Sequence, residues 1–131
     1  MVKSILIADD NGLVRQRLCG LFSREAGFEV CGKTENGREA IRKAQELHPD
    51  LILLDLSLPL MNGLDATRVL KRVMPEVPII MYSAYGDSFT EKEARSAGVS
   101  ALIPKSEPIS VLLAKARSLV FRLPLDLLPA S

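Results

Sequence analysis

Short runs that are apolar at every position are the sequence feature that most constrains this fold. Residues 51–54, Leu-Ile-Leu-Leu, form the clearest of these runs. A strand without polar alternation is buried on both faces, as in a parallel sheet covered by helices on each side. Similar runs alternate with helical patterns along the chain, which is typical of parallel β-α-β units. The sequence therefore predicts an α/β domain.

Five strands are expected, and four of them are nearly continuous in apolar residues. The five strands are predicted at residues 4–8, 28–32, 51–54, 77–82 and 101–103. The second run alternates polar and apolar residues, so one of its faces is less covered and the strand belongs at a sheet edge. With right-handed crossovers, this favours a flavodoxin-like, doubly wound five-stranded parallel sheet in the order 2-1-3-4-5.

Five helices are expected between and after these strands. Apolar residues at helical spacing lie at 13–22, 40–47, 66–73 and 111–120, with the second helix opening at Asn36, and a capping-box spacing predicts a short fourth helix over 88–97. Asn36 is predicted to cap the second helix and Ser88 the fourth, each with a Glu three residues later. Gly27 is the predicted stop of the first helix, and Pro108 is expected in the first turn of the fifth.

Composition excludes several classes of protein. Seventeen basic and sixteen acidic residues give a net charge of +1, so no charge excess favours nucleic acid or an anionic membrane as a partner. Cys19 and Cys31 are too few and too far apart for a disulfide framework or a zinc site, and we expect both to pack as small apolar residues. Residues 5–8 are too short an apolar run for a signal peptide or a membrane span. We therefore expect one cytoplasmic domain.

Polar side chains follow four of the five expected strands. Asp9 and Asp10 end the first strand, Asp55 the third, Ser83 the fourth and Lys105 the fifth. The carboxyl ends of parallel strands meet at one edge of the sheet, where ligands bind in folds of this kind. We therefore expect these five side chains to converge on one rim.

Three carboxylates in one crevice would repel one another unless a cation joined them. Mg²⁺ prefers oxygen ligands, and Asp10, Asp55 and the backbone carbonyl near Ser57 could supply them. With the ion in place, Asp55 could act as a nucleophile towards a phosphoryl group, and Lys105 and Ser83 could neutralise and bind its oxygens. The rim therefore predicts magnesium-dependent acceptance of a phosphoryl group.

Four motifs occur in a fixed order along the chain. They are Asp9-Asp10, the segment D-L-S-L-P-L-M-N-G at residues 55–63, Ser83 with the alanine after it, and Lys105. Each element alone is common, but the four in this order are specific. Together they resemble the receiver domain of bacterial two-component response regulators, and the resemblance spans nearly the whole chain.

The resemblance implies a role for each residue of the rim. Asp55 would be the phosphoacceptor, Asp9 and Asp10 would hold Mg²⁺ together with it, Lys105 would contact the phosphoryl group, and Ser83 would be the switch hydroxyl. It also implies a sensor histidine kinase as the phosphodonor. Phosphorylation would change an interaction face formed by the fourth helix, fifth strand and fifth helix, which could serve a homodimer or another target.

Two positions depart from the family pattern. Receivers usually carry an aromatic residue three positions before the lysine, where this chain has Leu102, so the resemblance does not support aromatic gating of the interaction face. Ser106 follows the lysine, where many receivers have proline. The stretch I-P-K-S at residues 103–106 is similar to receivers joined to a helix-turn-helix domain, and no such domain follows in these residues.

Two other functions and the role of the tail stay open. The chain could be a receiver-like interaction module that is never phosphorylated, or a phosphatase with an aspartyl-phosphate intermediate. Haloacid-dehalogenase-like phosphatases place a second Asp where this chain has Ser57, so we expect no enzyme.

The receiver is predicted over residues 1–121, followed at 122–131 by an apolar tail whose prolines prevent a continuous helix. The tail is either a linker or strap, or an interaction segment.

Overall fold

The structure is a computed structural model that describes residues 1–84 and 86–121. Five parallel strands lie in the order β2-β1-β3-β4-β5. The strands are β1 (Lys3–Ala8), β2 (Phe28–Thr34), β3 (Leu51–Asp55), β4 (Ile79–Ser83) and β5 (Ala101–Pro104). The helices are α1 (Gly12–Arg24), α2 (Gly37–Leu47), α3 (Gly63–Val73), α4 (Ser88–Ala97) and α5 (Ile109–Val120). The predicted fold class and strand order are confirmed.

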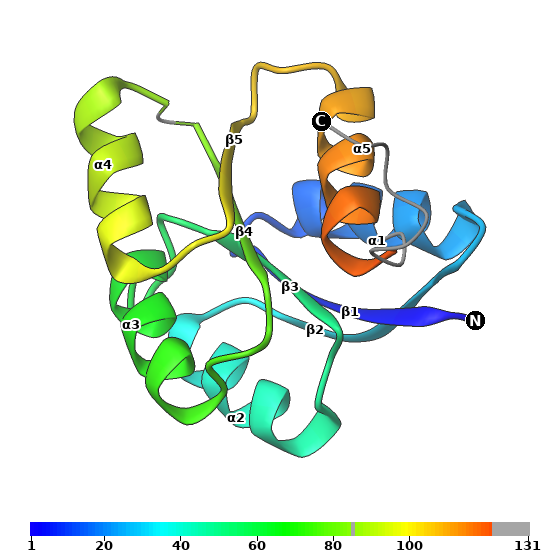
Figure 1. Cartoon of the computed structure of the whole chain (residues 1–131), viewed down its shortest axis with the longest axis horizontal. Helices are drawn as coiled ribbons and strands as arrows, with labels where there is room; N and C mark the ends of the chain where they lie inside the picture. The colour runs from blue at the N-terminus through cyan, green and yellow to red at the C-terminus, as the bar shows by residue number, and fades with distance from the viewer. Residues whose placement is uncertain (85, 122–131) are drawn as a thin grey trace, which may run out of the picture.

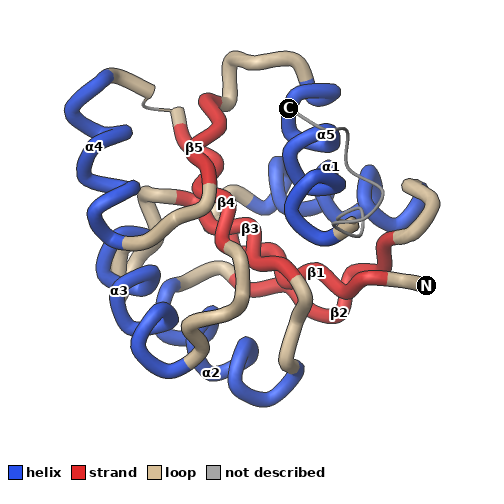
Figure 2. The backbone as a smooth tube through the Cα atoms, in the orientation of Figure 1, coloured by secondary structure: helices blue, strands red, loops and turns tan. Residues whose placement is uncertain are grey.

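Helices cover both faces of the sheet (Figure 1, Figure 2). On one face, α1 and α5 pack against alternate strand residues such as Ile7 and Leu53. On the other face, α2, α3 and α4 pack against the intervening residues, including Leu6 and Ile52. Every residue of β3 is buried because successive side chains point into two separate cores. This explains why the central strands lack polar alternation.

The edge position predicted for the second strand is confirmed, since β2 pairs only with β1 among the described strands. Its burial alternates, and Glu29 and Lys33 are exposed. The other edge strand is β5, which follows α4. Strand limits differ slightly from the predicted ones: β4 begins at Ile79, two residues later than expected, and β3 includes Asp55.

Asn36 caps α2 as predicted, because its side chain accepts a hydrogen bond from the backbone N–H of Glu39 at 2.8 Å. The other three predicted helix ends differ from the structure by one or two residues. Asp87, not Ser88, caps α4, and its carboxylate accepts from the Thr90 N–H. The C-cap of α1 is Glu25, two residues before Gly27, and Pro108 occupies the N-cap position just before α5. Each segment holds neighbouring residues that could serve as the end, and backbone geometry selects one.

Cys19 and Cys31 are free, partly buried thiols that pack against the two different cores, as expected of small apolar residues. Burial raises the pKa of both thiols, which favours the uncharged form.

In the part of the chain that the structure describes, no helix has both the length and the apolar character needed to cross a membrane.

Candidate functional site

Three carboxylates lie together at the carboxyl edge of the sheet. Asp9 and Asp10 follow β1, and Asp55 is the last residue of the neighbouring strand β3. One oxygen from each carboxylate lies within 4.8 Å of the others. Asp9 and Asp55 are almost fully buried, whereas Asp10 is exposed. The cluster is therefore open to solvent on the side of Asp10.

Lys105, just after β5, reaches into the same cluster. Its Nζ lies 3.1 Å from Asp9 Oδ2 and 3.3 Å from Asp55 Oδ2. The backbone N–H of Lys105 donates to the Ser83 carbonyl at 2.6 Å, which fixes the start of the β5–α5 loop on β4. One ammonium group therefore joins the ends of β1, β3 and β5.

The two serines of the predicted site lie beside Asp55 in different ways. Ser57 is exposed, and its backbone N–H donates to Asp55 Oδ1 at 3.3 Å. Ser83 is fully buried at the end of β4, the strand that lies between β3 and β5. The structure thus brings the predicted rim residues to one edge from four strands, as the topology requires.

Burial and charge act together on the ionisation of this cluster. Burial, and then the negative charge of Asp9, raise the pKa of Asp55 more than Lys105 and the Ser57 N–H lower it. Burial lowers the pKa of Lys105, but the hydrogen bond to Asp9 and the charges of Asp55 and Asp9 outweigh it, so the pKa is raised overall. Lys105 is therefore stabilised in its charged form. The positive charge around Asp55 does not fully compensate the cost of ionising its buried carboxyl.

The residues present fit a hard divalent cation. Three carboxylates and one ammonium leave two formal negative charges unbalanced in a partly buried cluster. Carboxylate oxygens are the ligands that Mg²⁺ prefers, and an open side such as that at Asp10 leaves room for the waters it retains. Asp9, Asp10 and Asp55 could therefore hold such an ion.

Residues 5–117 match the family described as the response regulator receiver domain. The chain belongs to this family. The chemotaxis protein CheY of Thermotoga maritima is 40% identical over 105 residues, which make up 80% of this chain and 87% of that protein. A protein-glutamate methylesterase/protein-glutamine glutaminase of Alkalilimnicola ehrlichii is 38% identical over 76% of this chain, but the match spans only 26% of that relative. The family resemblance drawn from the motifs is thereby confirmed.

A solved receiver structure shows the same fold. The response regulator domain of Thermotoga maritima CheB superimposes with a TM-score of 0.85 at 29% identity, over 95% of this chain and 100% of that one. Receiver domains bind Mg²⁺ at an acidic pocket. In this receiver, the Asp9, Asp10 and Asp55 cluster is the candidate for that pocket.

Arg15 of α1 also contacts this edge of the receiver, and the sequence patterns did not single it out. Its Nη1 donates to the Asp9 carbonyl oxygen at 2.8 Å, and its Nη2 lies 3.9 Å from Glu35 in the β2–α2 loop. Arg15 therefore links two loops behind the carboxylates. An arginine in a helix otherwise has the pattern of a surface residue, so no sequence signal distinguishes it.

Leu102, which replaces the usual aromatic residue of receivers, is half-buried in β5. It packs against the core shared by α2, α3 and α4, which includes Met81, Ala94 and Val99. An aliphatic side chain therefore occupies the position where receivers usually carry an aromatic ring.

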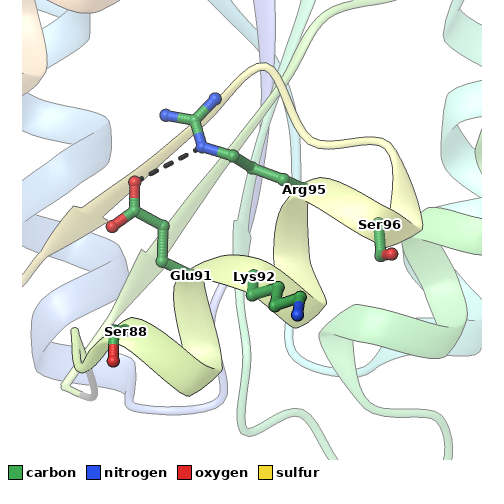
Figure 3. A pocket seen from close by; sticks show the side chains of 5 residues that line it. All are labelled: Ser88, Glu91, Lys92, Arg95 and Ser96. Atoms are coloured by element: carbon green, nitrogen blue, oxygen red, sulfur yellow. Dashed lines mark hydrogen bonds and ion pairs between the residues drawn. The ribbon is translucent and has the colours of Figure 1, made fainter.

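A separate hollow of the receiver runs along the outer side of α4 and shares no residue with the carboxylate cluster (Figure 3). Its lining residues are Ser88, Glu91, Lys92, Arg95 and Ser96. All five are exposed, and Glu91 Oε1 accepts from Arg95 Nε at 3.3 Å across one helical turn. The hollow is an open helix surface lined by polar and charged residues, none of which is buried.

Proposed function

We propose that this receiver accepts a phosphoryl group on Asp55 from a sensor histidine kinase, with Mg²⁺ held by Asp9, Asp10, Asp55 and the backbone carbonyl of Ser57. The observation that carries the proposal is Lys105 Nζ within hydrogen-bond distance of both buried carboxylates, at 3.1 and 3.3 Å. An acid at that depth, flanked by a second carboxylate and one fixed cation, matches what phosphoryl transfer requires. Receiver domains take phosphoryl groups from histidine kinases, which gives the donor class.

In the proposed reaction, a carboxylate oxygen of Asp55 forms the new bond to phosphorus. The bond between phosphorus and the donor's imidazole nitrogen breaks, and its electron pair leaves with the imidazole. Mg²⁺, when bound, neutralises charge on the phosphoryl oxygens. Lys105 supplies a second positive charge from β5, and the Ser57 N–H holds Asp55 Oδ1 in orientation. Phosphoryl transfer needs mainly positioning and charge neutralisation of this kind.

The new charge on Asp55 would change the partners of Lys105 and of the Ser83 hydroxyl, and so bias a two-state equilibrium. We place the moving element at α4, because it buries little: Ala94 and Ala97 are its only buried residues. Phe89 in its first turn is 72% exposed. A helix held by two alanines can shift at small cost. The α4–β5–α5 face would then dock a target or a second copy.

We also propose that the chain turns over no substrate of its own. Ser57 is exposed at the position where a phosphatase of the haloacid-dehalogenase type would need a general acid. The methylesterase relative extends far beyond the matched region. Stoichiometric rather than catalytic use of a phosphodonor is therefore expected.

Acetyl phosphate, a small phosphodonor, tests the proposal directly. We expect the intact mass of the wild-type protein to increase by one phosphoryl group in Mg²⁺ and to stay unchanged in EDTA. Asp55→Asn should gain nothing, because an amide is not nucleophilic enough to accept the group. Asp50→Asn is the matched control, since Asp50 is exposed and bonded to Ser4 at the start of β1, away from the cluster. An unmodified wild type, or a modified Asp55→Asn, would refute the assignment.

For the domain boundary, we propose that the receiver is complete at residue 121 and that 122–131, which lie outside the described residues, form a linker. The support is a cluster at the end of α5, where the Phe121 ring packs edge-on against Phe28 with the ring centroids 5.5 Å apart. Arg117 donates to Glu25 at 2.9 Å in the same place. The last described turn is thus anchored to α1 and β2.

Deleting residues 122–131 should leave the midpoint of urea unfolding and the phosphorylation rate unchanged, because the anchoring side chains all remain. A second deletion that also removes Phe121 should lower the free energy of unfolding by about 3 kcal/mol, as expected for loss of a packed aromatic ring. Circular dichroism in urea measures both. Unfolding of the shorter deletion would show that the tail is a structural strap instead.

A further inference from the structure

Gly37, the first residue of α2, lies directly against the loop that follows Asp55. Its backbone N–H donates to the Pro59 carbonyl at 3.3 Å. A Cβ at residue 37 would lie 1.9 Å from the Met61 carbonyl oxygen, and no side chain fits in that space. The positive-φ glycines among the described residues are Gly27 and Gly98, so the backbone angles of Gly37 do not themselves require glycine. Close approach to the loop is what requires it.

This contact lies beside a strained residue of the loop. The Pro59 carbonyl accepts from both Met61 N–H, at 2.7 Å, and Gly37 N–H. Leu60, between Pro59 and Met61, has a φ of 67°, in the left-handed region that leucine avoids. Leu60 is 71% exposed, so core packing does not hold it there. Strained residues persist only where their surroundings fix them, and here α2 is one of those surroundings.

The same loop carries a group that contacts Asp55 directly. The Ser57 N–H donates to Asp55 Oδ1, and the Ser57 carbonyl is a proposed magnesium ligand. Leu58, the next residue, is buried in the core shared by α2, α3 and α4. Only three residues separate Ser57 from Met61, so the chain has little length in which to absorb a displacement of Met61. Pressure from α2 would therefore reach Ser57.

We propose that Gly37 is a positioning residue for magnesium binding: the lack of a side chain lets α2 seat the Pro59–Met61 turn, which sets the position of Ser57. The inference rests on the proposed function. A Cβ would force the Met61 carbonyl to move by about 1 Å or more to reach ordinary contact. Mg²⁺ requires near-ideal octahedral geometry, so a displaced backbone ligand weakens binding. Displacements of this size at a distance can cost about a hundredfold in function.

The test is the Mg²⁺ dissociation constant, measured by calorimetry on the full chain. Gly37→Ala should raise it about tenfold or more, and should slow phosphorylation by acetyl phosphate mainly at low Mg²⁺. Gly32→Ala is the matched control. A Cβ there would meet only the flexible ends of Leu47 and Leu6, and should lower the urea midpoint without changing Mg²⁺ affinity. If both variants weaken Mg²⁺ binding equally, or Gly37→Ala binds like the wild type, the inference is wrong.

Hydrogen exchange on the wild-type protein gives a readout that needs no variant, and it decides the matter if Gly37→Ala does not fold. Saturation with Mg²⁺ should slow exchange of the Gly37 N–H about tenfold, because the ion stabilises the loop carrying its acceptor. The Lys3 N–H donates to the Gly27 carbonyl at the amino end of β1, away from the carboxylates, and its exchange should be unaffected. Unchanged exchange at Gly37 in a protein that binds Mg²⁺ overturns this inference alone. A wild type that binds no Mg²⁺ overturns the proposed function, and this inference with it.

Discussion

Replacing Gly63 by alanine is expected to lower the free energy of unfolding by about 3 kcal/mol, the upper part of the usual range for overpacking a buried site. Gly63 is the first residue of α3 and lies against the end of β3. A Cβ there would lie 2.3 Å from the Asp55 carbonyl oxygen and 2.9 Å from Leu56 Cα. Both are backbone atoms, so no rotamer change relieves the clash. The strand end and the helix start would have to separate.

Urea unfolding followed by circular dichroism measures this effect. Gly20→Ala is the control, because a Cβ at residue 20 in the middle of α1 meets nothing closer than 3.9 Å. It should raise stability by up to about 1 kcal/mol, since alanine is the better helix former. Equal stability of Gly63→Ala and the wild type would show that the close contact between α3 and β3 does not exist in solution.

Replacing Lys105 by methionine is expected to lower the free energy of unfolding by about 2–3 kcal/mol at neutral pH without Mg²⁺. The variant leaves Asp9 and Asp55 buried without their shared cation, and an unpaired buried charge is costly. Burial and the charge of Asp9 already raise the pKa of Asp55, and loss of the ammonium should raise it further. A carboxyl with a raised pKa in the folded state favours folding when protonated, and this contribution is lost as pH rises through that pKa.

The difference in the free energy of unfolding between Lys105→Met and the wild type should therefore narrow at acidic pH, where Asp55 is protonated. It should also narrow when Mg²⁺ is added, because the ion binds the folded cluster and replaces part of the missing charge. Unfolding in urea at neutral and acidic pH, with Mg²⁺ or EDTA, measures both trends. Lys115→Met, at an exposed position on α5, is the control. If the difference in the free energy of unfolding responds to neither pH nor Mg²⁺, Lys105 has only a packing role.

The topology could be predicted because it follows from residue patterns that local physics controls. The all-apolar run before Asp55 required a strand buried on both faces, and the alternating second run required an edge. The convergence of Asp9, Asp10 and Lys105 followed from topology alone, since parallel strands place their carboxyl ends at one edge. No distance between the side chains was needed for that step.

Features that depend on how separate loops approach one another could not be predicted. Arg15 has an ordinary helical position, and only the fold brings its guanidinium to the Asp9 carbonyl. Gly37 has the sequence context of any residue after a helix cap, and only the position of Met61 explains it. The choice of Asp87 over Ser88 as the α4 cap is a similar case, because both residue types cap helices well and backbone direction decides.

Crystals grown with Mg²⁺ and beryllofluoride, a stable mimic of a phosphoryl group, test the central claim most directly. We predict beryllium bonded to a carboxylate oxygen of Asp55, with Mg²⁺ held by the three carboxylates and the Ser57 carbonyl. Lys105 should then contact the fluorides. An empty cluster, with Lys105 still bonded to Asp9 and Asp55 as it is here, would contradict the account.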